Sequence, residues 1–322
     1  MTFPLLRKII NDSRWLLLSS VITLFVFAWI RVAIVSSMET YQLQRIARNL
    51  PEMIKRLSPV PIEDLIFYPG LIGFTFEEPM VYLIMAVWTV SRASDCVSGE
   101  LGRGTMEMLL SQPIGRVKYL LVHTSVTLAG VLLLATAAYA GTHVGVERSN
   151  VKVKVNVARW QAPFGFQLPN TQAEENVKLI PMTTYVKPQV FQAAAINYAC
   201  FGVFLAGVTT ALSCCDRYRW RTIALVVAFY VFQTILELTG MAVDGFRWLL
   251  RFTFFSIYEP VAFSTQASKD LTSSWRFLAK ESTGSLPDLG PLGYDAILLS
   301  LGLVGILLGV WIFRRRDLPA PL

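Results

Sequence analysis

Six stretches of apolar residues, each about as long as a membrane-crossing helix, dominate the pattern along the chain. A helix needs about 20 mostly apolar residues to cross the hydrocarbon core of a bilayer. The predicted spans cover residues 15–35, 70–90, 119–144, 193–212, 222–243 and 296–313. This pattern predicts an all-α polytopic membrane protein, with six transmembrane helices in a single membrane domain over residues 1–322.

The segments outside the spans have patterns of their own. Residues 1–14 mix apolar and basic positions, which predicts an amphipathic helix lying on the membrane interface. Residues 38–57 have a helical apolar period and predict a second interfacial helix. In the loop 145–192, residues 151–157 alternate strictly between apolar and polar, which is typical of a strand. A small β-containing extracytoplasmic loop is therefore expected there.

The loop 244–294 begins with an apolar and aromatic stretch and ends with polar residues. Residues 246–263 are interrupted by Arg247, Arg251, Glu259 and Pro260, which argues against a seventh span. An interfacial or re-entrant segment is expected instead.

Composition supports the membrane class. Charged residues make up 16% of the chain and hydrophobic residues 54%, whereas soluble domains carry about 25% charged residues. This excludes an ordinary soluble enzyme and a disordered protein. The four cysteines include two neighbours and no C-x-x-C motif, so they are interpreted as small apolar side chains rather than a disulfide framework.

The placement of Lys and Arg predicts how the chain is oriented, because cytoplasmic loops are enriched in these residues. The basic residues are dense in both terminal tails and in the short loops after the second and fourth spans: Arg7, Lys8 and Arg14; Arg92, Arg103, Arg116 and Lys118; Arg217, Arg219 and Arg221; Arg314, Arg315 and Arg316. Both termini are therefore predicted to be cytoplasmic, in an inner or plasma membrane.

Motifs for enzyme chemistry are missing from the sequence. The pair Gly-Lys never occurs, so the chain has no phosphate-binding loop of the G-x-x-x-x-G-K-[ST] type. The two histidines, His123 and His143, lie 20 residues apart on one span. That is roughly 30 Å along a helix, too far to share a metal. We expect no catalytic residues, metal or other cofactor, and no nucleic-acid partner.

Carboxylates within the spans are the first candidates for function, since a charged group there needs a partner helix or a wet cavity. Glu237 has Gln233 one turn earlier on the same face, which fits either a transport pathway or an interhelical hydrogen bond. Glu77 and Glu78 precede Pro79, which fits either the start of a helix with acids at its positive end or a substrate site.

The segment 91–118 after the second span carries the strongest signal. Glycines at 99, 102 and 104 predict a bend, and Thr105 and Pro113 predict the start and end of a short helix. Apolar residues would form an exposed ridge on this helix: Met106, Met108, Leu109 and Leu110. From physics alone, the ridge could dock a partner or rest on the inner leaflet.

This segment resembles the loop after the second helix in the ABC-2 family of ATP-binding-cassette transporter permeases, which has the pattern E-x-x-x-G-T-x-E-x-L-L-x-x-P-[IV]-x-R. The matching residues are Glu100, Gly104, Thr105, Glu107, Leu109, Leu110, Pro113, Ile114 and Arg116. The basic N-terminal element, the six spans and the two cytoplasmic ends are also similar to that family. The long, partly β outer loop and the Glu77-Glu78 interruption depart from it.

The resemblance implies a permease subunit that moves a substrate with ATP hydrolysed by a separate ATPase subunit, and that pairs with a second permease subunit in the bilayer. The segment 91–118 would be the cytoplasmic coupling loop. Glu100, Arg103 and Glu107 would pair with charges on the ATPase, and Gly102 and Gly104 would shape the bend. Two alternatives stay open: a secondary transporter that uses Glu237 for ion coupling, and a membrane-embedded enzyme.

Overall fold

The computed structural model describes residues 2–38, 67–111, 114–154, 177–278 and 288–316. Within these residues, six helical segments are long and apolar enough to cross a membrane: Phe3–Ser37, Tyr68–Gly102, Arg116–Arg148, Pro188–Cys215, Arg219–Ala242 and Pro291–Arg315. The six predicted spans are confirmed, and the chain is an all-α polytopic membrane protein. Each segment is longer than its apolar stretch, because backbone hydrogen bonding continues into polar turns beyond the hydrocarbon core.

The first span is a single 36-residue helix, α1 (Thr2–Ser37). Residues 2–14, predicted as a separate interfacial element, are its first turns. Pro4 lies in the first turn, where no backbone donor is needed, and neither Gly nor Pro follows before Ser37. With nothing to break it, the helix extends about 54 Å, well beyond the roughly 30 Å hydrocarbon core.

The second span is interrupted by a 3₁₀ turn near its start and by a π-helical turn near its end. It runs through α5 (Tyr68–Gly73), the 3₁₀ turn η1 (Phe74–Glu77), α6 (Pro79–Ser94), the π-helical turn η2 (Asp95–Gly99) and α7 (Glu100–Gly102). Pro79 opens α6 after extended backbone at Glu78, as the sequence predicts.

The predicted loop 91–118 is therefore mostly helical. Its first part continues the second span as far as Gly102, and its last residues begin the third span. Only the short helix α8 (Met106–Leu110) and its flanking residues lie between the two spans. Polar residues after Thr89 suggested a loop, but they continue the helix because their side chains bond to neighbouring helices.

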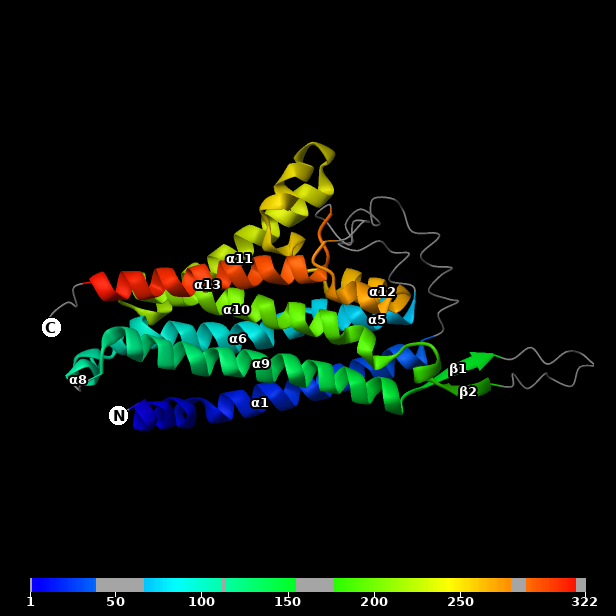
Figure 1. The fold of residues 1–322 in the computed structure, drawn as a ribbon, viewed down its shortest axis with the longest axis horizontal. Helices are drawn as coiled ribbons and strands as arrows, with labels where there is room; N and C mark the ends of the chain where they lie inside the picture. Colours follow the sequence, from blue (N-terminus) through cyan, green and yellow to red (C-terminus); the bar gives the residue numbers. More distant parts are fainter. Residues whose placement is uncertain (1, 39–66, 112–113, 155–176, 279–287, 317–322) are drawn as a thin grey trace, which may run out of the picture.

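The bundle packs around α10 (Gln192–Cys215), which lies against α9 (Arg116–Arg148), α6 and α13 (Pro291–Arg315) (Figure 1). Glycines bring α10 and α13 close together: a Cβ atom added to Gly305 would lie 2.6 Å from the carbonyl carbon of Gly207. Small residues at such crossings allow the backbones to approach closely without lipid between them.

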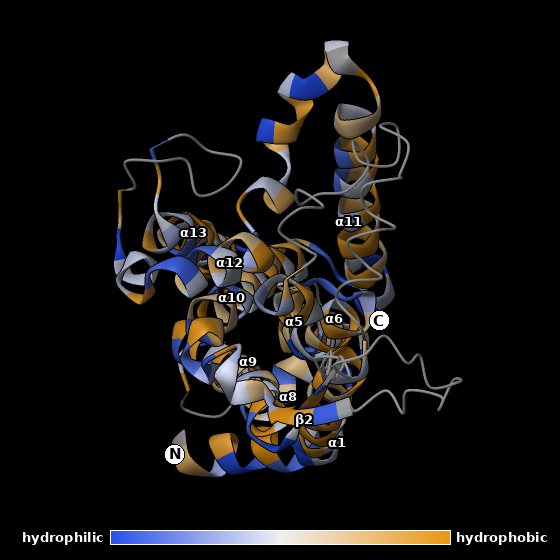
Figure 2. Ribbon diagram, turned by 90° about the vertical axis from the view of Figure 1, so that its right-hand side faces the viewer, coloured by the Kyte–Doolittle hydropathy of each residue, from blue (hydrophilic) through white to orange (hydrophobic). Residues whose placement is uncertain are grey.

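The fifth span, α11 (Arg219–Ala242), stands apart from the bundle (Figures 1 and 2). Several of its large apolar side chains are exposed: Leu225, Val227, Val231, Phe232, Ile235 and Leu238. No described part of the chain covers these side chains, so this apolar face is open to lipid or to another subunit. The chain then turns back along α11 through the 3₁₀ segment η5 (Asp244–Phe252).

The segment between the third and fourth spans contains a pair of strands, which lies at the end of the bundle away from α8 (Figure 1). Strand β1 (Asn150–Lys154) pairs antiparallel with β2 (Val177–Pro181), and Val151 lies opposite Ile180. Residues 155–157 of the predicted strand lie outside the described residues.

Short helical elements precede and follow the later spans. After η5 follow η6 (Phe254–Ser256), α12 (Pro260–Lys269) and η7 (Leu271–Trp275). Before α10 lie η3 (Met182–Thr184) and η4 (Pro188–Phe191). The described part of 246–263 forms short helices and no seventh span.

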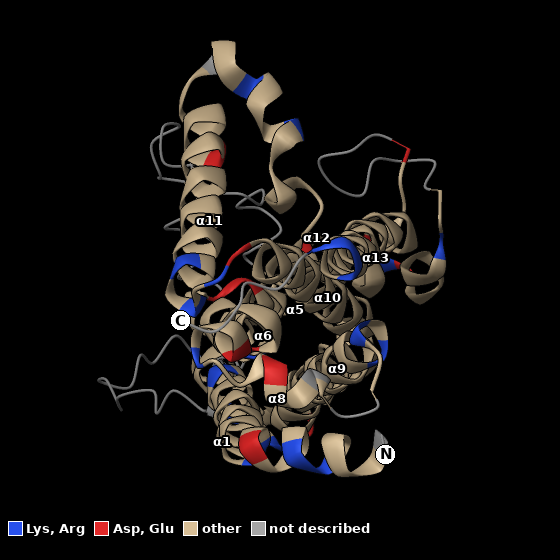
Figure 3. Ribbon diagram, turned by 90° about the vertical axis from the view of Figure 1, so that its left-hand side faces the viewer, with Lys and Arg blue, Asp and Glu red and all other residues tan. Residues whose placement is uncertain are grey.

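Both ends of the described chain lie at one end of the bundle, together with α8 (Figure 1). We call this the terminal end, defined by the start of α1, by α8 and by the end of α13. Figure 3 looks onto it and shows Lys and Arg gathered at the first turns of α1 and α11. A cytoplasmic location for this end stays a prediction. The helix predicted over residues 38–57 is not described by the structure from position 39 onward.

Candidate functional site

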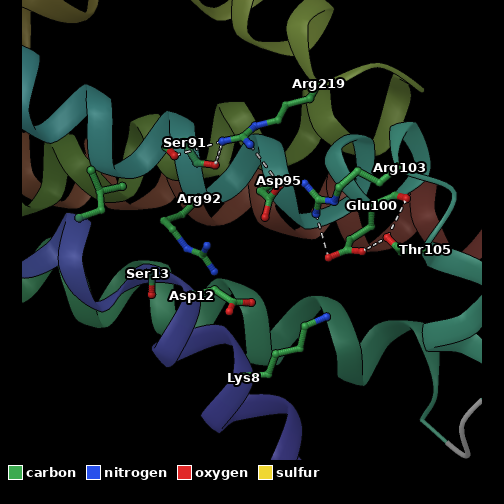
Figure 4. A pocket seen from close by; sticks show the side chains of 11 residues that line it. Lys8, Asp12, Ser13, Ser91, Arg92, Asp95, Glu100, Arg103, Thr105 and Arg219 are labelled. Atoms are coloured by element: carbon green, nitrogen blue, oxygen red, sulfur yellow. Dashed lines mark hydrogen bonds and ion pairs between the residues drawn. The ribbon is translucent and has the colours of Figure 1, made fainter.

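A charged pocket of about 380 Å³ opens at the terminal end, between the first turns of α1 and the junction of α6 with α7 (Figure 4). It is lined by four basic side chains, three carboxylates and four others: Lys8, Arg92, Arg103 and Arg219; Asp12, Asp95 and Glu100; Ser13, Leu16, Ser91 and Thr105. The pocket therefore brings three predicted coupling residues together with side chains from the first, second and fifth spans.

The π-helical turn η2 shapes one wall of this pocket. Its backbone is held by Ser213 of α10, whose hydroxyl oxygen accepts hydrogen bonds from the N–H groups of Val97 at 3.3 Å and Ser98 at 3.1 Å. A Cβ atom at Gly99 would lie 2.5 Å from Oδ1 of Asp95, so a larger residue there would displace this carboxylate. Single π turns inside α-helices are rare and frequent at functional sites, and this one fixes the Asp95 carboxylate beside the pocket.

Asp95 joins two segments that are far apart in the sequence. Its Oδ1 accepts a hydrogen bond from Nη1 of Arg103 at 2.7 Å and lies 3.4 Å from Nη1 of Arg219. Arg103 also pairs with Glu100, with 3.0 Å between Nη2 and Oε1. The hydrogen bond to Asp95 raises the pKa of Arg103 above its ordinary value. The start of α11 is thus linked to the residues that lead into α8.

Arg92 is the most deeply buried charge in the pocket wall, with 6% of its surface exposed. Its Nη2 lies 3.3 Å from Nε2 of His123, and its Nε has no hydrogen-bond partner among the described residues. Within that same part of the chain, no carboxylate forms an ion pair with it. Figure 4 shows its guanidinium extending from α6 toward the pocket.

The turn into α8 differs from the predicted one. Gly104 has a φ of 71°, so the sharp bend occurs at this glycine rather than across all three. Thr105 precedes α8 but its side chain does not cap the helix. The Thr105 hydroxyl instead donates to the carboxylate of Glu100, which ties the start of α8 to α7.

The predicted apolar ridge of α8 is divided between the inside and the outside. Met106 is buried at 1% exposure, in a cluster with Leu5 and Ile9 of α1. Leu109 packs against the same cluster and is half-buried. Met108 is 71% exposed, and Glu107 is exposed as well. One face of α8 therefore packs into the apolar cluster at the terminal end, and the other face is exposed.

The remaining predicted coupling residues have other surroundings. Gly102 is exposed, and Arg116 opens α9 and donates to the backbone carbonyl of Arg316 at 2.8 Å. Pro113 and the Leu110 side chain lie outside what the structure describes. Arg116 thus fixes the start of the third span to the end of the sixth.

Glu77 and Glu78 lie far from the pocket, at the start of α6 and toward the end of the bundle where β1 and β2 lie (Figure 1). Glu77 accepts a hydrogen bond from the backbone N–H of Val261 at 3.3 Å, in the first turn of α12. Glu78 pairs with Arg31 of α1 at 2.9 Å. The two acids directly precede the start of α6 at Pro79, as predicted for carboxylates at the positive end of a helix. No side-chain hydrogen bond caps α6, and the same acids also connect it to α12 and α1.

Gln233 and Glu237 lie on the half of α11 away from the pocket. Gln233 is buried, and its Oε1 accepts a hydrogen bond from the backbone N–H of Phe254 at 3.3 Å. Glu237 is half-buried, near enough to Glu259 for their charges to repel. The 18 residues from Arg219 to Glu237 place it roughly 27 Å from the pocket along the helix.

Several pocket residues were not among the predicted site residues. Lys8, Arg92 and Arg219 counted only as signs of orientation, while Asp12 and Asp95 had no assigned role. A usable signal was the run Arg92-Ala93-Ser94-Asp95, where two opposite charges three residues apart follow an apolar span. The part played by Arg219 depends on a contact between distant segments, which a single sequence does not show.

Comparison with known proteins does not assign the chain to a family: neither a scan of protein-family models nor a search of curated proteins finds a match. Within the described residues, no three His, Cys, Asp or Glu side chains gather closely enough to hold a metal ion. The charged side chains of the pocket form ion pairs and hydrogen bonds, which can hold charged groups or transmit movement between helices.

Proposed function

We propose that this chain is the membrane subunit of an ATP-binding-cassette transporter of the ABC-2 type. It would move a substrate across an inner or plasma membrane, driven by ATP hydrolysis on a separate ATPase subunit, and would pair with a second permease subunit. The support from sequence is the resemblance of residues 100–116 to the coupling loop of that family. The support from structure is the position and bonding of α8.

The observation that carries the proposal is a continuous set of contacts from α8 to three spans. Thr105 bonds to Glu100, Glu100 pairs with Arg103, and Arg103 shares Asp95 with Arg219 at the start of α11. On its other side, α8 packs through Met106 into the cluster that contains the first turns of α1. A push on α8 would thus reach the first, second and fifth spans.

In this mechanism the chain has no catalytic residues. Closure of the ATPase dimer would press on the exposed face of α8, at Glu107 and Met108. Because the ends of α6 and α11 share Asp95, they would move together and change access to a path between the two membrane halves. Glu100 and Arg103, whose charges are already paired within the chain, would transmit this movement rather than bind the ATPase.

The test is co-purification of a tagged chain from its native membrane, followed by mass spectrometry of bound subunits. We expect a partner that contains G-x-x-x-x-G-K-[ST]. Met108→Glu should reduce its recovery about tenfold, because an exposed methionine buried at an interface contributes roughly 1.5–3 kcal/mol and 1.4 kcal/mol is tenfold. Met108 is a sharper probe than Leu109, which already packs inside the chain.

The matched control is Leu179→Glu, which makes the same kind of change on an exposed apolar residue of β2, at the opposite end. It should leave recovery of the partner unchanged. Recovery of no ATPase subunit from a well-expressed chain, or equal recovery with Met108→Glu, would contradict the proposal.

Secondary transport with ion coupling through Glu237 has one observation in its favour. Glu237 is half-buried in α11, and the carboxylates of Glu77 and Glu259 are its electrostatic neighbours. Neighbouring acids suit ion coupling, but Glu237 lies on the half of α11 away from Asp95 and α8, roughly 27 Å along the helix from Arg219. The two functions differ in the expected effect of Glu237→Gln: ion coupling predicts loss of transport, whereas the ATP-driven mechanism predicts that transport persists.

A further inference from the structure

The charged pocket has more positive charge than its own carboxylates neutralise. Four basic side chains face three acids. Two of the acids, Asp95 and Glu100, already pair with Arg103 and Arg219 at 2.7–3.4 Å. The remaining charged groups are Lys8, Arg92 and Asp12, which together leave one positive charge without a partner.

Arg92 contributes most to this unbalanced positive charge. Its guanidinium is more than nine-tenths buried, and its single hydrogen-bond contact among the described residues is the ring nitrogen of His123. The buried Nε donor has no partner there. An unpaired buried charge is costly. The planar fork of donors on a guanidinium matches the oxygens of a phosphoryl or carboxylate group.

Lys8 approaches the same space from the opposite wall. It lies on an exposed face of α1 and extends its ammonium group into the pocket, with Asp12 one turn further along the same helix (Figure 4). Among the described residues, neither Lys8 nor Asp12 forms an ion pair. A phosphoryl group in the pocket would therefore meet cations from two helices that have no ion-pair partner among the described residues, and one carboxylate in the same condition, Asp12.

Exposed tryptophans indicate the depth of the pocket in the membrane. Trp15, Trp220 and Trp311 are 72%, 69% and 54% exposed, and all three lie toward the terminal end of their helices. Tryptophan is enriched at the level of lipid headgroups. Lys8 is two turns from Trp15, and Arg219 is the neighbour of Trp220. The pocket thus opens where the phosphates of membrane lipids lie.

We propose that this pocket binds one phosphoryl group, that of an anionic membrane lipid, between Arg92 and Lys8. The same chemistry would also accept free phosphate, and separate titrations with lipid and with inorganic phosphate distinguish the two sources. The chain would bind this group without any ATPase subunit. The absence of lipid binding would therefore not contradict the proposed function, and the absence of an ATPase partner would not contradict lipid binding. A bound lipid would bridge α1 to the α6–α7 junction and so stabilise the position of α8.

The experiment is native mass spectrometry of the purified chain in detergent, titrated with phosphatidylglycerol, phosphatidylcholine or inorganic phosphate. We expect one phosphatidylglycerol to be retained in preference to phosphatidylcholine. Lys8→Gln should weaken its binding about tenfold, as expected for one charge-assisted hydrogen bond. Asp12→Asn should strengthen binding, because it removes the competing carboxylate.

The matched control is Arg7→Gln, which removes the same charge from the neighbouring position of α1 but outside the pocket. It should change binding less than twofold. Arg92→Lys, which keeps the charge and removes the planar fork, should weaken binding if that variant folds; the exposed Lys8 and Asp12 variants decide the matter if it does not.

Binding of inorganic phosphate alone, with the same dependence on Lys8, would assign the site to a soluble phosphate group and support the phosphoryl chemistry. Equal effects of Lys8→Gln and Arg7→Gln would overturn the proposal, since the attraction would then be a property of the whole basic surface. Weaker binding by Asp12→Asn would also overturn it.

Discussion

Asp95→Asn tests the link between α8 and the fifth span, because it keeps the shape of the side chain and removes the charge that two arginines share. The Asp95 side chain is 18% exposed, and those of Arg103 and Arg219 are 46% and 39% exposed. Exposed ion pairs are worth about 0.2–1 kcal/mol, whereas breaking a buried pair costs about 3–5 kcal/mol. For this intermediate case we expect a loss of about 1–2 kcal/mol.

The loss should be local, because Asp95 bonds to residues around the pocket and lies outside the apolar core. Hydrogen–deuterium exchange measures the free energy of such local opening. A loss of about 1–2 kcal/mol predicts exchange roughly 5–30 times faster over residues 100–111. Exchange in the middle of α10 should stay the same.

Two variants make this prediction specific. Glu147→Gln removes a carboxylate that lies 3.7 Å from His143 near the opposite end, and should leave exchange over 100–111 unchanged. Arg219→Gln should have a smaller effect than Asp95→Asn, because it leaves the 2.7 Å bond between Arg103 and Asp95 in place. Unchanged exchange over 100–111 in the Asp95 variant would refute the assignment of Asp95 as the connecting residue.

Two further predictions concern the fifth span and the orientation. Glu237→Gln should leave partner recovery and ATP-driven transport intact, since Gln233 makes the hydrogen bond that holds η6 to α11; loss of transport in an assembled complex would favour ion coupling. In a Cys215→Ser background, which removes the exposed cysteine, a membrane-impermeant thiol reagent applied from outside should label Lys152→Cys but not Ser111→Cys. Equal labelling of the two positions would contradict cytoplasmic termini.

The sequence predicted the positions of the six spans well, because apolar length is a direct physical requirement of the bilayer. Boundaries were less predictable. The stretch from Ser91 to Gly102 contains serines, glycines and charges, which suggested a loop, yet it continues the helix. Ser213 explains this difference, since its hydroxyl oxygen accepts hydrogen bonds from the backbone N–H groups of Val97 and Ser98 and so supports η2 through a contact between spans two and four.

The candidate site was predicted in part. Its local elements, the bend at Gly104 and the short helix after Thr105, follow from residues close together in the chain. Its charge pairing does not: Arg103 was expected to contact a partner, whereas it bonds to Asp95 and Glu100 of its own chain. The inward position of Met106 likewise depends on how α1 packs, which helix periodicity within α8 alone does not determine.

The central claim is that the exposed face of α8 docks onto an ATPase subunit, and site-specific photocrosslinking tests it most directly. A photoreactive amino acid in place of Met108 should crosslink, in native membranes, to a subunit that contains G-x-x-x-x-G-K-[ST]. The same amino acid in place of Leu179, which is 58% exposed at the opposite end, should not. Crosslinks from position 108 to lipid alone would contradict the account and indicate that α8 rests on the membrane surface.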